Sequence, residues 1–170
     1  MPASDQGVKS GQRYQLVPRT LIFVTYGDSV LLIKGAPHKR LWAGLYNGIG
    51  GHVECGESIL EAARRELGEE TGLSGDDPWL VGIVTVDTGE DTGVCIFVFR
   101  VVLKEAVDKQ PRLSPEGTLE WVSIDQLQEL PTVEDLPLLL PRVLEREPGE
   151  SPFMAAYAYD DQDRLLIRFT

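Results

Sequence analysis

Residues 58–72 have the pattern of a single helix with clear ends. Ser58 and Glu61 have the spacing of a capping box, in which each side chain satisfies a backbone N–H group at the start of a helix. Gly72 is a typical helix stop, because glycine adopts the left-handed conformation that ends many helices. Between these ends, three apolar residues recur every fourth position and can face a core: Ile59, Ala63 and Leu67.

The last turn of this helix carries three glutamates. At about 100° per residue, Glu69 and Glu70 lie within roughly 60° and 40° of Glu66 around the axis, so the three carboxylates share one face. The end of a helix carries negative partial charge and disfavours acids, and only Arg64 and Arg65 lie close by as bases. A solvated acidic face is the ordinary interpretation of such a cluster. Carboxylates placed against the local field instead favour an external hard cation such as Mg²⁺, Mn²⁺ or Ca²⁺.

The composition is that of a globular domain of ordinary size. The chain has 170 residues, of which 42% are hydrophobic and 25% charged. No apolar run approaches the roughly 20 residues that span a bilayer, and the polar stretch 1–13 lacks the apolar core of a secretory signal, so we expect a flexible leader. The net charge of −11 argues against binding of polymeric nucleic acid. Two cysteines, Cys55 and Cys95, favour a reducing, cytoplasmic location.

Short apolar segments rich in β-branched residues predict a sheet. Segments 19–26 and 29–35 predict one hairpin, 78–88 and 93–103 a second, and 153–159 with 164–169 a third. A further short strand is expected at 120–124.

Two helical segments are expected near the C-terminal end. Ser123 and Gln126 have capping-box spacing ahead of a short helix at 123–130. Segment 133–147 is expected to be helical only in part, because Pro137 and Pro141 oppose a regular interior. The chain as a whole predicts an α+β fold with one mixed sheet and helices packed on it.

The fixed residues of 51–73 resemble the complete signature of the Nudix hydrolases. These residues are Gly51, Glu57, Arg65-Glu66-Leu67, Glu69-Glu70 and Gly72-Leu73. The resemblance implies the Nudix fold, an α/β/α sandwich around a mixed β-sheet, formed here by a single domain at 14–170.

The family resemblance also implies an activity and a cofactor. Nudix hydrolases are metal-dependent pyrophosphohydrolases of nucleoside diphosphates linked to another group, and Mg²⁺, with Mn²⁺ as substitute, is the expected ion. By position, the Gly50 carbonyl, Glu66, Glu69 and Glu70 match the metal ligands.

Three more positions complete the expected catalytic group. Arg65 matches the residue that pairs with acids, here Glu57 and Glu66, and no lysine is expected near the site. A further acid often comes from a loop before the last strand, where Glu116 is the candidate metal ligand or general base. Glu120 falls in the expected strand, where a structural cross-strand role is as plausible.

The residues before the signature resemble the MutT-type branch, the 8-oxo-dGTP diphosphatases. By that resemblance, Asn47 contacts the purine, although it also suits a turn before Gly48. His52 is a candidate phosphate contact or an ordinary loop residue. Glu134 and Asp135 are the acids nearest to the pair that reads the oxidised base in the animal members, with different spacing.

The best interpretation is hydrolysis of an oxidised purine nucleoside triphosphate to monophosphate and pyrophosphate by a monomer or homodimer. One alternative is a Nudix hydrolase of another substrate, such as a dinucleoside polyphosphate or a nucleotide sugar. The other is a nucleotide sensor without turnover. The sensor is disfavoured because such domains usually lose signature glutamates, and none is lost here. The expected partner is thus a small nucleotide and not a membrane or a nucleic acid polymer.

Overall fold

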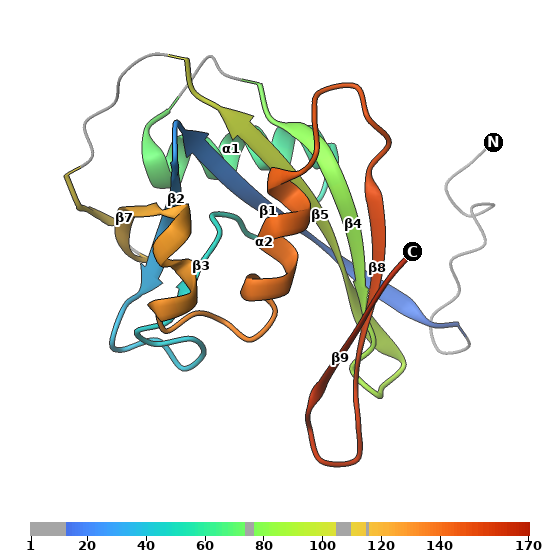
Figure 1. Cartoon of the computed structure of the whole chain (residues 1–170). Helices are drawn as coiled ribbons and strands as arrows, with labels where there is room; N and C mark the ends of the chain where they lie inside the picture. The colour runs from blue at the N-terminus through green and yellow to red at the C-terminus, as the bar shows by residue number, and fades with distance from the viewer. Residues whose placement is uncertain (1–12, 74–76, 105–109, 115) are drawn as a thin grey trace.

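The computed structural model describes residues 13–73, 77–104, 110–114 and 116–170. All of the predicted leader except the exposed Arg13 lies outside the described residues. Within the described part, nine strands form one sheet (Figure 1). In chain order they are β1 (Gln15–Tyr26), β2 (Ser29–Gly35), β3 (Tyr46–Asn47), β4 (Trp79–Val86), β5 (Thr92–Val102), β6 (Arg112–Ser114), β7 (Gly117–Ser123), β8 (Phe153–Tyr159) and β9 (Leu165–Phe169).

The sheet is mixed, as the sequence predicted. Its order is β6-β7-β2-β1-β5-β4-β8-β9, with β3 paired to β2 beside this path. The three predicted hairpins, β1–β2, β4–β5 and β8–β9, are confirmed as antiparallel pairs. The pairs β1–β5 and β4–β8 are parallel and join the hairpins into one surface. No described helix is long and apolar enough to cross a membrane.

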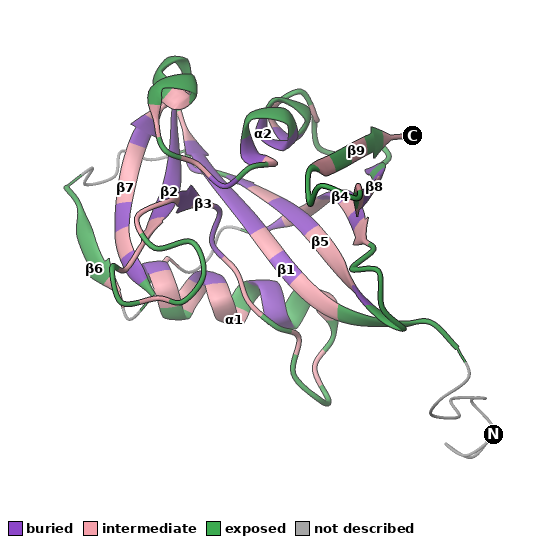
Figure 2. Cartoon of the chain, turned by 90° about the horizontal axis from the view of Figure 1, so that it is seen from below, coloured by how far each residue is buried: buried purple, intermediate pink, exposed green. Residues whose placement is uncertain are grey.

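Helices α1 (Ile59–Thr71) and α2 (Leu136–Leu144) cover opposite faces of the sheet (Figure 2). On the α1 face, Ala63 and Leu67 pack into a cluster with residues of β1 and β2 such as Ile22. On the α2 face, four buried helix residues pack against the other side of the same strands: Leu136, Leu139, Leu140 and Val143. The predicted α/β/α sandwich is therefore confirmed.

The start and stop of α1 follow the predicted signals. The Glu61 N–H donates to the Ser58 hydroxyl at 3.3 Å, and the Ser58 N–H donates to the Glu61 carboxylate at 2.7 Å. Gly72 adopts the left-handed conformation, with φ 71°, and its N–H donates to the Gly68 carbonyl. Because both ends are fixed in this way, the acidic last turn has a defined position.

The two helical segments predicted near the C-terminal end are confirmed, each with one local correction. Ile124–Glu129 is a 3₁₀ helix, and its preceding residue Ser123 makes no side-chain capping bond, because Ser123 still pairs as the last residue of β7. Helix α2 also continues through Pro141. Pro137 lies in its first turn, where no N–H is required, and Pro141 lies on the exposed side, where water can solvate the carbonyl left unpaired.

Candidate active site

The loop before α1 lies against β1 and fixes the backbone of the two signature glycines. The Ile22 and Ile49 backbones exchange hydrogen bonds at 2.6 and 3.1 Å, and the Thr20 N–H donates to the Gly51 carbonyl at 2.9 Å. Gly50 has φ 147°, and any side chain there would overlap the Thr20 carbonyl. Only glycine suits this position. Among the described residues the Gly50 carbonyl accepts no hydrogen bond, so it is free to bind a ligand.

The acidic last turn of α1 packs against this loop. A side chain at Gly51 would overlap the Glu66 carboxylate, so the absence of a side chain lets the acid approach the backbone. The Gly50 N–H is close enough to stabilise the Glu70 carboxylate. Glu69 is exposed at the rim, whereas Glu66 and Glu70 are half-buried. The loop and the helix thus place the Gly50 backbone and the three predicted carboxylates on one side of the molecule.

Arg65 is the hub of this acidic region. Its Nε and Nη2 donate to the two oxygens of Glu57 at 3.1 and 2.8 Å, and its Nη1 donates to Glu66 at 2.8 Å. Further donations reach Glu69 at 3.4 Å and the His52 carbonyl at 3.1 Å. These hydrogen bonds lower the pKa of Glu57 and raise the pKa of Arg65, so the group stays ionised.

Glu70 is strained electrostatically. Burial, followed by repulsion from Glu66, raises the pKa of Glu70 to about 7. Its Oε2 atom is buried and has no hydrogen-bond partner in the part of the chain that the structure describes. An acceptor left bare in this way costs free energy unless a donor or a cation satisfies it.

These residues fit a hard divalent cation. Three carboxylates and a backbone carbonyl supply the oxygen ligands that such ions prefer, and the bare Glu70 oxygen is available to one. In the described ranges, no three acidic, histidine or cysteine side chains form a group that could hold a metal ion by themselves. Arg65 holds Glu66 and Glu69 instead.

The expectation that no lysine lies near the site is wrong. Lys39, in the loop between β2 and β3, forms an ion pair with Glu116, the predicted fourth acid. The charge of Lys39 also acts on Glu70. Sequence spacing could not reveal this contact, because the loop position of Lys39 is set by the backbone bond from the Ala36 N–H to the Glu116 carbonyl, 3.1 Å long.

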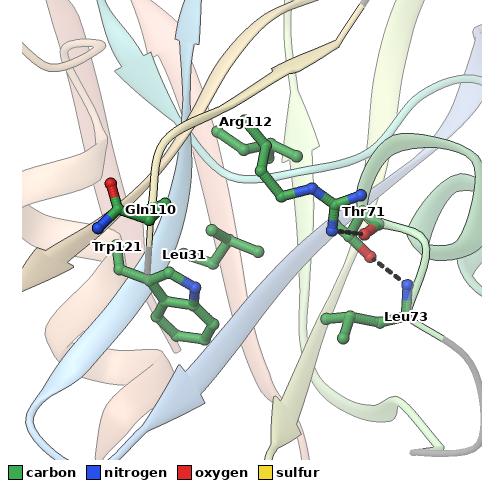
Figure 3. A pocket seen from close by; sticks show the side chains of 7 residues that line it. Leu31, Thr71, Leu73, Gln110, Arg112 and Trp121 are labelled. Carbon is green, nitrogen blue, oxygen red and sulfur yellow. Dashed lines mark hydrogen bonds between the residues drawn. The ribbon is translucent and has the colours of Figure 1, made fainter. Parts of the chain in front are cut away.

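A second basic residue that the sequence analysis missed caps the C-terminal end of α1. Arg112 of β6 donates to the Thr71 carbonyl at 2.8 Å, although the last turn of α1 contains no base of its own (Figure 3). The guanidinium lies beside a cavity of about 270 Å³ whose walls include Leu73 and Trp121. None of the predicted carboxylates lines this cavity.

Two predicted substrate-contacting residues are held by neighbours. The Asn47 side-chain oxygen accepts the Gly48 N–H at 2.7 Å, which is the turn role, while its amide nitrogen has no partner in the described chain. His52 accepts a hydrogen bond from the Arg19 side chain at 3.1 Å. The Asn47 oxygen and the His52 Nε2 atom are therefore already engaged, and only the other polar atom of each side chain is available to a ligand.

The two candidate base-reading acids differ in environment. Glu134 is exposed, and its carboxylate accepts the Leu165 N–H at 3.4 Å. Burial raises the pKa of Asp135, which lies close to the hydroxyl of Tyr157 on β8. The segment before them runs beside β3, where the Val133 N–H donates to the Tyr46 carbonyl at 3.0 Å. Asp135 and Asn47 therefore belong to neighbouring segments.

Glu120 has the structural role that its position in a strand suggested. The Tyr46 hydroxyl donates to its carboxylate at 2.6 Å, which joins β3 to β7 across β2. Burial, together with this hydrogen bond, raises the pKa of Tyr46 to about 12. The hydrogen bond to Tyr46 thus accounts for the Glu120 carboxylate in the described chain.

Comparison with known proteins adds the family context. The NUDIX domain model matches residues 15–143. The oxidized purine nucleoside triphosphate hydrolase of Mus musculus is 31% identical over 148 residues, which cover 86% of this chain and 89% of that protein. The Danio rerio protein of the same name is 33% identical with the same coverage. A mutator MutT protein from Bacillus halodurans has a TM-score of 0.71 and 31% identity, covering 91% of this chain and 97% of that chain.

Proposed function

The chain belongs to the NUDIX family and is a pyrophosphohydrolase, and we propose that it hydrolyses oxidised purine nucleoside triphosphates to the monophosphate and pyrophosphate. The observation that carries this proposal is the joint position of the signature residues. The Arg65 fork holds Glu57 and Glu66, while Glu70 presents a bare buried oxygen next to Gly50. Such an arrangement favours positioning of phosphate and cation over covalent catalysis.

The proposed cofactor is Mg²⁺, with Mn²⁺ as a substitute. Glu66, Glu69, Glu70 and the Gly50 carbonyl would hold it, with Glu116 as a further ligand or as general base. When bound, such an ion neutralises phosphate charge and lowers the pKa of water. This chain's own part is to orient the carboxylates: Arg65 fixes Glu66, and the glycine backbone fixes the side of the loop that faces the acids.

The reaction is the hydrolysis of one phosphoanhydride bond. A water oxygen forms a new bond to phosphorus, the bridging P–O bond breaks, and pyrophosphate leaves with the bonding electron pair. A carboxylate accepts the proton that the water loses. Glu116 suits this role because it lies on a loop, half exposed, and its only ion-pair partner among the described residues is the partly exposed side chain of Lys39.

The purine would be read by Asn47 and Asp135. Asn47 both donates and accepts hydrogen bonds, and its amide nitrogen is available. Asp135, rather than Glu134, is the base-reading acid, because its burial favours the protonated form that donates to a base carbonyl. Segment 131–133 is hydrogen-bonded to Tyr46 of β3, which supports a shared pocket for Asn47 and Asp135.

Residues 14–170 would act as one catalytic domain. The β8–β9 hairpin lies beyond the matched segment 15–143, yet β8 pairs with β4 and supplies Tyr157 beside Asp135. Both cysteines are free thiols, which supports a reducing cytoplasm as the place of action.

Product analysis tests the proposed reaction. The full chain is incubated with 8-oxo-dGTP and Mg²⁺ in ¹⁸O-labelled water, and the products are separated and weighed. The expected result is monophosphate and pyrophosphate in equal amounts, with one labelled oxygen and no reaction in excess chelator. Release of diphosphate and inorganic phosphate, or turnover that is indifferent to chelator, would overturn the proposal.

A further inference from the structure

Among the described residues, the ion pairs of the acids at this site are made by Arg65 and Lys39. Arg65 uses its donors on Glu57, Glu66, Glu69 and the His52 carbonyl, so it has none to spare. Glu116 is instead paired with Lys39. Burial and Glu66 raise the pKa of Glu70, and Lys39 acts in the opposite direction. In the part of the chain described, Lys39 is thus the cation that serves the acids beyond the reach of Arg65.

Lys39 has a fixed backbone and a movable end. The Lys39 N–H donates to the Ala36 carbonyl at 3.0 Å, and the Ala36 N–H donates to the Glu116 carbonyl at 3.1 Å. The loop is therefore tied to the β6–β7 turn right beside the ion pair. The side chain of Lys39 is 32% exposed and that of Glu116 50% exposed. A flexible four-carbon stem lets an ammonium at such a surface change partners without moving the backbone.

We propose that Lys39 is a phosphate-binding residue of the nucleotide site and that, before ligands arrive, it occupies the cation-binding side of Glu116. This inference rests on the proposed function. A divalent ion among the carboxylates repels the ammonium and takes over their charge. The triphosphate brings negative oxygens to the same place, and they become the strongest available partner for Lys39.

This role predicts effects of opposite sign on two ligands. Lys39 competes with a metal ion for Glu116 in the free protein, so its removal tightens metal binding. Lys39 attracts phosphate in the complex, so its removal weakens nucleotide binding. A residue that only holds the 36–45 loop in place would, when removed, weaken both. The two signs therefore separate ligand binding from a structural role.

The test uses the full-length Lys39→Met variant, which keeps the length of the side chain and removes its charge. Mn²⁺ binding without nucleotide is measured by electron paramagnetic resonance, and KM and kcat for 8-oxo-dGTP are measured at saturating Mg²⁺. The Mn²⁺ Kd should fall by about two- to fivefold, as expected for one partly exposed ion pair. KM should rise by about tenfold, with a smaller change in kcat.

Two further variants complete the test. Lys39→Arg keeps the charge and should keep a KM near that of the wild type, while Lys104→Met changes an exposed lysine after β5 and should change neither ligand. An unchanged KM in Lys39→Met, or weaker Mn²⁺ binding, would overturn the inference while the proposed function stands. Failure of the wild type to bind Mn²⁺ would overturn both.

Discussion

Arg65 holds Glu57 with a two-pronged contact: Nε donates to Oε2 at 3.1 Å and Nη2 donates to Oε1 at 2.8 Å. The Glu57 carboxylate also accepts the Glu54 N–H at 2.6 Å, so the loop before α1 is tied to the helix at this point. The third guanidinium nitrogen remains free to hold Glu66. Since a planar fork makes all these contacts at once, Arg65 positions a candidate metal ligand relative to the loop.

Arg65→Lys should therefore lower kcat by about 10²-fold or more, because an ammonium cannot reproduce the fork. The melting temperature of the metal-free protein should change little, since the pair is partly exposed. Steady-state kinetics with Mg²⁺ and thermal unfolding in chelator measure the two effects.

Arg64→Lys is the matched control for that variant. Arg64 is the preceding residue of the same helix and pairs with the exposed Asp77 instead of the signature acids. It should keep full activity. Full activity in Arg65→Lys, or a variant that mainly unfolds, would contradict the positioning role.

Glu70→Gln should separate stability from activity. Glutamine keeps the size of the side chain and removes its charge, so the rate should fall by about 10²-fold or more. The metal-free variant should nevertheless melt about 2–4 °C higher than the wild type at pH 8. The reason is that it no longer carries a negative charge that burial desolvates and that Glu66 repels.

The pH dependence follows from the direction of the shift. The folded-state pKa of Glu70 is raised from 4.5 to about 7, so the folded protein holds the proton more tightly than the unfolded chain. The stability from this group is present below pH 4.5 and lost as pH rises through 7. The gain in melting temperature of Glu70→Gln should thus shrink from pH 8 to pH 5. A gain that is equal at both pH values would contradict this account of Glu70.

Arg112→Gln should loosen the C-terminal turn of α1. The variant loses the charge that offsets the negative end of the helix and the donor to the Thr71 carbonyl. We expect faster amide exchange at Gly72 and Leu73 and a melting temperature about 2–4 °C lower. Arg164→Gln, in the exposed β8–β9 turn, is the control and should leave exchange in α1 unchanged. Unchanged exchange at Gly72 in Arg112→Gln would show that the cap contributes nothing.

The parts of the fold that carry a local signal could be predicted from the sequence. Ser58, Glu61 and Gly72 bound α1 because capping is a matter of a few neighbouring residues. The long apolar strands follow from their own pattern of side chains. Strands β3 and β6 could not be predicted, since two or three residues become strands only by pairing with β2 and β7.

The site shows the same division. The shared face of Glu66, Glu69 and Glu70 follows from helix geometry. Lys39 pairs with Glu116, and Arg112 binds the Thr71 carbonyl at the end of α1. Both come from segments distant in sequence, and no local pattern marks either residue. Helix α2 was underestimated because the cost of a proline depends on which side of the helix it occupies, and Pro141 occupies the exposed one.

Substitutions at 134 and 135 should identify the base-reading acid. Asp135→Ala removes the half-buried carboxyl that we propose reads the base, and it should lower the preference for oxidised dGTP over dCTP by about tenfold, as expected when one polar group of the base loses its partner. Asp135→Asn keeps a neutral donor and should keep most of the preference. Glu134→Ala, at an exposed position, is the control. A larger loss in Glu134→Ala than in Asp135→Ala would reverse the assignment.

Asn47→Ala should act on the base and not on the chemistry. The variant removes the available amide donor together with the contact to the Gly48 N–H. The preference for oxidised purines should shrink, while slow hydrolysis of poor substrates remains almost unchanged. A loss that is uniform across nucleotides would assign Asn47 to the turn alone.

We propose that Asn47 and Asp135 read the purine of a nucleotide whose phosphates bind at the acidic face of α1. The decisive measurement is the ratio of kcat/KM for 8-oxo-dGTP to that for dCTP and dTTP, taken with the wild-type chain at saturating Mg²⁺. The account predicts a ratio of at least about tenfold, since a pocket built on polar pairs penalises a base that leaves a partner unpaired. Equal turnover of all three nucleotides would contradict it.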